Sequence, residues 1–249
     1  MDVVRYDLTS DPVRLKANRW TRHRVRSRED MRGVVSHSWQ ANVGTTATER
    51  LRYGESLALA RRASEAPYNI SAGVTRHGQP IAVFAHPVER YTYASDAACR
   101  DFISIGVMGL YPFEERTRDA GRHSALSDAM FAAVDEAMRW AVELLPADGP
   151  HVLITHRQAI NGRGDHIQCS GEGVVKMFLA SRAVACGRII ADPDLVLVPE
   201  FGRPWPASWR SHVQVTKGLP NIASRVSAEH HALPLMPVGE DGSAATHSA

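Results

Sequence analysis

Two histidines and one cysteine occupy positions from which a chain can build a metal site. His37 lies near the end of the β-branched run Gly33–Ser38, and His156 directly follows a second apolar run, His151–Thr155. Residues at the ends of sheet strands commonly face the cleft in which open α/β sheets bind ligands. Cys169 follows a polar, glycine-containing loop and stands just before a predicted helix. The three side chains are therefore candidates for one site.

Their chemistry suits zinc. Zn²⁺ favours imidazole and thiolate ligands, and a catalytic zinc site needs three protein ligands and an open position for water. His37, His156 and Cys169 would meet that requirement, and Asp165 or His166, in the loop before the cysteine, would be substitutes for the third ligand. The chain holds twelve histidines, so two at strand ends also arise by chance, and a buried cysteine often acts as a small hydrophobic residue. Spacing alone leaves both interpretations open.

The segments that would position these residues alternate between strands and helices. Apolar residues recur at helical spacing between Ser124 and Leu145, whereas the runs before the two histidines are β-branched. The predicted strands are 33–38, 68–75, 81–85, 102–110 and 151–155, and the predicted helices are 46–66, 124–145 and 173–185. Residues 76–79 form the turn of a predicted hairpin. This order predicts an α/β (α+β) fold, with a central mixed β-sheet flanked by helices.

Five short sequences along residues 33–180 carry a family resemblance. In order, they are Val34-Val35-Ser36-His37-Ser38, Tyr68-Asn69 leading into Arg76-His77-Gly78, Ser104-Ile105-Gly106-Val107, Ile154-Thr155-His156-Arg157, and Cys169-Ser170-Gly171-Glu172. This series resembles the zinc-dependent N-acetylmuramoyl-L-alanine amidases, together with bacteriophage amidases and peptidoglycan recognition proteins. The resemblance implies their fold, a zinc ion held by His37, His156 and Cys169, and hydrolysis of the amide between N-acetylmuramic acid and L-alanine in peptidoglycan.

The resemblance also implies a catalytic role for Tyr68, which matches the tyrosine of the family's Tyr-His pair and would hydrogen-bond the developing oxyanion or orient the water. The chain departs from the family elsewhere. Val107 and Met108 stand where some branches carry a glutamate, and Ile167 stands where others carry lysine or threonine. Some relatives bind peptidoglycan without cleaving it. A catalytically inactive recognition module is therefore the alternative to a lytic amidase of the endolysin or antibacterial-toxin type.

Two other classes of protein have weaker support. Cys169 could be a nucleophile with His156 as its base, but cysteine hydrolases usually place the nucleophile well before the histidine. Seven basic residues and no acid lie between Arg14 and Arg28, as in some polyanion-binding segments. No nucleic-acid fold motif accompanies them, and arginines packed onto the domain itself explain them as well. We therefore expect a peptidoglycan muropeptide as the partner, and no nucleic acid.

The composition and the ends of the sequence predict the domain organisation and the cellular compartment of the protein. The 249 residues are 44% hydrophobic with a net charge of +2, and three cysteines are too few for a disulfide framework. No secretion signal or long apolar stretch is visible, which predicts synthesis in the cytoplasm, no membrane insertion, and action on the wall after release or delivery. We expect a basic N-terminal arm (1–32), a zinc amidase-like domain (33–185), an extension packing on that domain (186–231) and a flexible tail (232–249).

Overall fold

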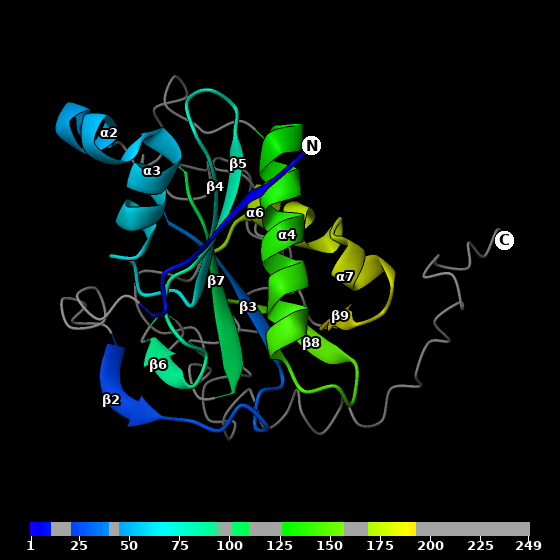
Figure 1. The fold of residues 1–249 in the computed structure, drawn as a ribbon. Helices are drawn as coiled ribbons and strands as arrows, with labels where there is room; N and C mark the ends of the chain where they lie inside the picture. The colour runs from blue at the N-terminus through cyan, green and yellow to red at the C-terminus, as the bar shows by residue number, and fades with distance from the viewer. Residues whose placement is uncertain are drawn as a thin grey trace, which may run out of the picture.

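A mixed seven-stranded sheet crosses the centre of the molecule (Figure 1). The computed structural model describes residues 1–10, 21–39, 45–92, 94, 101–109, 126–156 and 169–192. The strand order is β1-β5-β4-β7-β3-β8-β9. The strands are β1 (Val4–Asp7), β3 (Gly33–Ser38), β4 (Ile70–Val74), β5 (Pro80–Phe84), β7 (Phe102–Val107), β8 (His151–Thr155) and β9 (Ile189–Ala191). With helices packed on it, the sheet confirms the predicted α/β class.

The sheet is parallel at its centre. Strands β4, β7, β3, β8 and β9 run in one direction, whereas β5 is antiparallel to β4 and β1 is parallel to β5. Every residue of β3 and β7 is buried, as expected for central strands of a sheet covered on both faces. In β3 this buries three polar residues, Ser36, His37 and Ser38. The first residue of β3, Gly33, must be a glycine, because a Cβ there would lie 1.9 Å from the carbonyl oxygen of Val152.

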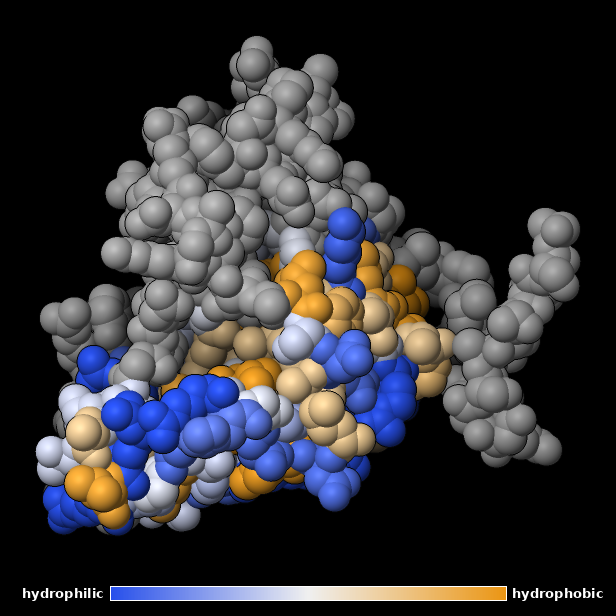
Figure 2. Space-filling view, turned by 90° about the horizontal axis from the view of Figure 1, so that it is seen from above, coloured by the Kyte–Doolittle hydropathy of each residue, from blue (hydrophilic) through white to orange (hydrophobic). Residues whose placement is uncertain are grey.

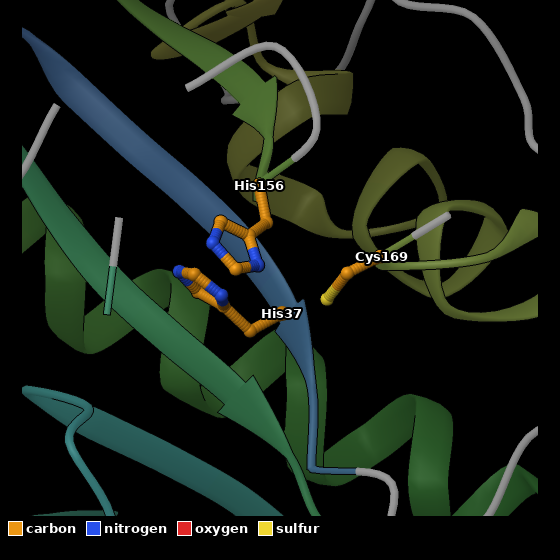
Figure 3. Close-up of side chains that lie close together, drawn as sticks. All are labelled: His37, His156 and Cys169. Atoms are coloured by element: carbon orange, nitrogen blue, oxygen red, sulfur yellow. The ribbon is translucent and has the colours of Figure 1, made fainter. Parts of the chain in front are cut away.

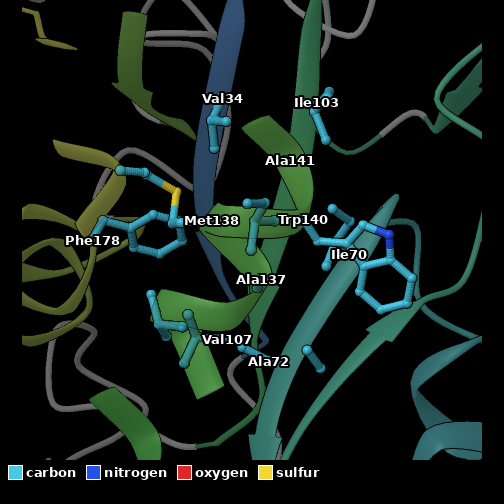
Figure 4. Packing of buried hydrophobic residues seen from close by; sticks show 14 of the residues in the cluster. Val34, Ile70, Ala72, Ile103, Val107, Ala137, Met138, Trp140, Ala141 and Phe178 are labelled. Carbon is cyan, nitrogen blue, oxygen red and sulfur yellow. The ribbon is translucent and has the colours of Figure 1, made fainter. Parts of the chain in front are cut away.

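Helix α4 (Asp128–Leu144) covers one face of this sheet. Its first turn is capped by Ser127, whose hydroxyl accepts a hydrogen bond from the backbone N–H of Met130. Ala133, Ala137 and Ala141 lie at helical spacing on its buried side, and such small side chains let a helix lie close to a sheet. Figure 4 shows the resulting core, in which α4 meets apolar side chains from the strands and from α6 (Glu172–Leu179).

Two predicted helices are each divided in the structure. The 46–66 segment forms α2 (Ala47–Tyr53) and α3 (Glu55–Ala63), because Gly54 between them adopts φ +72°. Helix α3 packs on β5 with a second apolar cluster that includes Leu59 and Val83. The 173–185 segment forms α6 and α7 (Arg182–Ala185), with Ala180 and Ser181 between the two helices.

Parts of the segment 1–32, expected to be a basic arm, form strands. Strand β1 pairs with β5 at the sheet edge, and the Arg5 guanidinium bridges to the Glu136 carboxylate and lies 4.7 Å from the ring centroid of Trp140. Strands β2 (Thr21–Val25) and β6 (Arg90–Thr92) pair in a small separate sheet. These pairings need partners far along the chain, which local sequence patterns cannot reveal. Residues 11–20 and the predicted tail, 232–249, lie outside the described residues.

Strand β9 pairs with β8 and forms the edge of the sheet opposite β1.

The surface in Figure 2 shows hydrophilic residues with small groups of hydrophobic ones among them. Among the described residues, the large exposed hydrophobic side chains are Met1, Val25, Leu51 and Leu126. They come from four separate segments, as on most protein surfaces. Within the described ranges, every helix is too short or too polar to cross a lipid bilayer.

Candidate metal centre

Strand register brings the two histidines together. Strands β3 and β8 are parallel neighbours, paired from Gly33 opposite Val152 to Ser36 opposite Thr155. Continued by one residue, this register sets His37 beside His156 on the same side of the sheet, because side chains alternate along a strand. Their ring centroids lie 4.4 Å apart, and both side chains are buried. The sheet itself therefore fixes the distance between the two imidazoles.

Cys169 reaches the same point from outside the sheet. It lies directly before the turn into α6, and its sulfur accepts a hydrogen bond of 3.3 Å from the backbone N–H of Ser38. The ligand atoms of His37, His156 and Cys169 all lie within 4.8 Å of one another, and Figure 3 shows the three side chains facing a common point. The structure thus brings together the three residues that the sequence offered as candidates for one site. Asp165 and His166 lie outside the described residues.

These three residues fit a zinc ion. Zinc binds histidine nitrogen at about 2.0–2.1 Å and cysteine sulfur at about 2.3 Å, so ligand atoms around one ion lie about 3–4 Å apart. The ligand atoms of the cluster lie within 4.8 Å of one another, the two imidazoles and one thiol are preferred zinc ligands, and all three residues are buried. Among the described residues three side chains can hold the ion, and three protein ligands with an open fourth position are the arrangement of a catalytic zinc site.

Tyr68 lies beside this cluster. Its ring centroid is 5.0 Å from that of His37 and 5.9 Å from that of Trp39. Burial, reinforced by the charge of Cys169, raises the pKa of the Tyr68 hydroxyl well above its usual value. The hydroxyl therefore stays protonated at neutral pH and can act only as a neutral hydrogen-bond donor or acceptor there.

Gly106 makes room for these rings. It pairs with His37 across β7 and β3, and a Cβ at Gly106 would lie 2.3 Å from Cδ2 of Tyr68 and 2.7 Å from Nε1 of Trp39. Sequence reasoning missed this role and missed Trp39 altogether. A glycine inside an apolar strand was the available signal, since it often marks a close approach. The Trp39 indole nitrogen is buried and has no hydrogen-bond partner among the described residues.

Asn69 holds the backbone next to Tyr68. Its side-chain oxygen accepts hydrogen bonds from the backbone N–H of Ser104 at 3.1 Å and from Arg26 at 3.3 Å. Its side-chain nitrogen donates to the carbonyl oxygens of His86 and Pro87. Arg26, from the basic N-terminal run, is itself buried and donates to the carbonyl oxygen of Phe102. This arginine therefore forms hydrogen bonds inside the protein.

No protein-family model and no curated protein sequence matches the chain. Solved structures do resemble it. The complex of tracheal cytotoxin with the ectodomains of peptidoglycan recognition proteins LCa and LCx is 13% identical, covering 72% of this chain and 96% of that one with a TM-score of 0.46. An endolysin of a Thermus scotoductus bacteriophage is 15% identical, covering 70% and 96% with a TM-score of 0.43. An endolysin N-acetylmuramoyl-L-alanine amidase from Clostridium intestinale is 12% identical, covering 71% and 93% with a TM-score of 0.41.

These resemblances are in fold alone. The cluster offers two imidazoles and a thiol as metal ligands. Beside them lie a protonated phenol on Tyr68 and an indole N–H on Trp39. A site with three ligands and an adjacent neutral donor is equipped for metal-assisted hydrolysis of a carbonyl compound.

Proposed function

We propose that this chain is a zinc-dependent hydrolase of the amide bond between N-acetylmuramic acid and L-alanine in peptidoglycan. The observation that carries the proposal is the convergence of His37, His156 and Cys169 within 4.8 Å, from three segments of the chain. The five short sequences that resemble the amidases supply the substrate class. Of these, the Tyr68 and Gly106 segments lie directly beside the cluster.

In this proposal His37, His156 and Cys169 hold the zinc ion. When bound, Zn²⁺ supplies a Lewis acid that activates water and polarises an amide carbonyl. The protein fixes the two imidazoles through the β3–β8 register, and the Ser38 N–H stabilises the sulfur of Cys169. Tyr68 would donate its hydrogen bond to the carbonyl oxygen as that oxygen gains negative charge. Asp165 and His166 remain candidates for protonating the leaving amine.

The direct experiment measures bound metal and the release of stem peptide from purified cell walls by the same preparation. We expect about one Zn²⁺ per chain and liberation of peptides with a free L-alanine amino group. Tyr68→Phe should keep zinc and thermal stability but lose about 10²–10³-fold in turnover, which is typical for removal of one oxyanion donor. His37→Ala should lose both metal and activity. Full activity in Tyr68→Phe would refute the role of that hydroxyl.

A specific observation supports a second candidate, a module that binds peptidoglycan without cleaving it. Val107 and Met108 stand where some amidase branches carry a glutamate, and both side chains lie in the two hydrophobic clusters. Both positions are therefore part of the hydrophobic core, and neither offers the carboxylate that those amidase branches have there. Zinc binding and wall binding without peptide release would favour the recognition module over the amidase.

A further inference from the structure

The position of Cys169 needs an explanation that the sheet does not provide. His37 and His156 are held by strand pairing, but Cys169 lies outside the sheet, at the start of the segment that leads into α6. Thiolate and imidazole ligands bind one ion only if their separation is set to within a few tenths of an ångström. The residues that tie the α6 segment to β3 therefore decide whether the third ligand is in place.

Two buried serines make that connection. The Ser170 hydroxyl donates to the backbone carbonyl oxygen of Ser36 at 2.8 Å, and the two hydroxyl oxygens lie 2.7 Å apart. The Ser36 hydroxyl also lies 3.4 Å from the carbonyl oxygen of Ile154. Both serines are essentially inaccessible to solvent. Each of the three residues is the immediate or next-but-one neighbour of a metal-ligand candidate: Cys169, His37 or His156.

Two hydroxyl groups supply two protons for three contacts, so two of the contacts are hydrogen bonds at any one time. In one arrangement Ser170 donates to the Ser36 carbonyl and Ser36 donates to the Ser170 hydroxyl. In a second arrangement, Ser170 donates to the Ser36 hydroxyl and Ser36 donates to the carbonyl oxygen of Ile154. In a third, Ser170 donates to the Ser36 carbonyl while Ser36 donates to Ile154. All three arrangements join the α6 segment to β3, and the last two extend the connection to β8.

The connection lies beneath the site rather than in it. Side chains alternate along β3, so Ser36 faces away from His37, toward the side on which α6 packs against the strand. No water reaches these hydroxyls to replace a lost partner, because both residues are buried. A further bond, from the Ser38 N–H to the Cys169 sulfur, reaches the same ligand from the next residue of β3 on that side.

We propose that Ser36 and Ser170 form a positioning pair that sets the Cys169 sulfur against the two imidazoles, and so sets the metal affinity of the cluster. This inference rests on the metal site of the proposed function but not on its substrate. Neither serine touches the metal ligands' donor atoms, so both act through Cys169. Residues that orient metal ligands in this way typically change affinity by about 10- to 100-fold when removed.

The test compares alanine variants by metal affinity. Ser170→Ala removes both contacts to Ser36, whereas Ser36→Ala leaves the bond from Ser170 to the Ser36 backbone. Ser181 supplies the matched control: it is equally buried, lies just beyond the other end of α6, and donates only within its own turn, to the carbonyl oxygen of Phe178 at 2.7 Å. We therefore expect zinc affinity to fall about 10- to 100-fold in Ser170→Ala, less in Ser36→Ala, and less than twofold in Ser181→Ala.

Affinity is measured by competition with a chromophoric chelator on variants whose circular dichroism shows a folded protein. Substitution with Co²⁺ adds a second readout, because the thiolate-to-cobalt absorption band reports the sulfur ligand alone. This band should weaken in Ser170→Ala and stay unchanged in Ser181→Ala. The double variant Ser36→Ala/Ser170→Ala should bind zinc no more weakly than Ser170→Ala, since Ser36 acts through Ser170.

The outcomes separate this inference from the proposed function. Equal zinc affinity in Ser170→Ala and wild type, or an equal loss in Ser181→Ala, would overturn the positioning pair and leave the amidase proposal standing. The expected affinity series in a protein that releases no stem peptide would support the pair and reject the amidase. Should Ser170→Ala fail to fold, the Ser36→Ala and Ser181→Ala comparison decides alone. A wild-type chain that binds no Zn²⁺ would overturn both.

Discussion

Replacing Gly106 with alanine tests whether the position of the Tyr68 ring matters for activity. The new Cβ would lie 2.3 Å from Cδ2 of Tyr68, whereas carbon atoms in contact are at least about 3.5 Å apart. The ring must therefore recede by about 1.2 Å, the difference between these two distances. A misplacement of about 1 Å can cost about 10²-fold in rate. The three atoms nearest to the new methyl group belong to Tyr68 and Trp39, and none belongs to His37, His156 or Cys169.

We accordingly expect Gly106→Ala to lose about 10²-fold in turnover of a soluble muropeptide while its zinc content stays at the wild-type level. Overpacking should lower the free energy of unfolding by about 1–3 kcal/mol. Gly73→Ala is the matched control on the neighbouring strand, because its Cβ would meet Cε of Met108 at 2.5 Å, the far end of a flexible side chain that can move. Gly73→Ala should thus keep its turnover.

The assay is steady-state turnover alongside metal analysis and thermal unfolding for both variants. Wild-type turnover in Gly106→Ala, with the ring shown by structure to have moved, would refute the argument that Tyr68 acts from its present position. Loss of zinc in Gly106→Ala would instead show that the glycine supports the metal ligands, and the rate could then not be assigned to Tyr68.

Three further predictions concern stability. Burial lowers the pKa of His86 to about 4, below an unfolded value of about 6.5, so the neutral form stabilises the fold above pH 6.5 and this contribution is lost as pH falls toward 4. Urea unfolding should show a slope of up to about 1.4 kcal/mol per pH unit across that window, and His86→Gln should flatten it. Asn69→Ala leaves several buried groups without their partner and should lower the free energy of unfolding by about 1–3 kcal/mol or more, measured by the same urea titration; an unchanged midpoint would contradict its role beside Tyr68. Adding Zn²⁺ at 100 times its dissociation constant should stabilise the wild type by about 2.7 kcal/mol, visible as a rise in Tm that a chelator reverses and that His37→Ala does not show.

The sequence predicted those elements whose signals are local. The strands at Gly33–Ser38 and His151–Thr155 have the bounds that were predicted from their β-branched and apolar residues. The long helix α4 follows the periodic positions between Ser124 and Leu145. Strands β1 and β9 were not predicted, because each is short and gains its hydrogen bonds only from a partner elsewhere in the sheet. Local patterns carry no information about such partners.

The candidate site divides in the same way. Residue type at strand ends was enough to bring His37, His156 and Cys169 together as candidates, and the structure places them within 4.8 Å. That they bind a metal stays a prediction. The clearance of the Tyr68 ring over Gly106 and the contact between Ser36 and Ser170 depend on register and helix placement. Neither could be read from sequence, because each joins residues that are far apart in the chain.

The strand order also bears on how the chain folds as it is synthesised. Among the strands that the structure describes, only β4 and β5 form a local hairpin. Val4 of β1 must wait for Ile81, and Gly33 of β3 for both Phe102 and Val152. Such non-local pairing makes folding slow, since each loop must close before its contacts form. Strand β3 is thus exposed on one edge until β8 has left the ribosome. The candidate metal cluster can assemble only later still, when Cys169 emerges, so the three ligand candidates meet only when the fold is nearly complete.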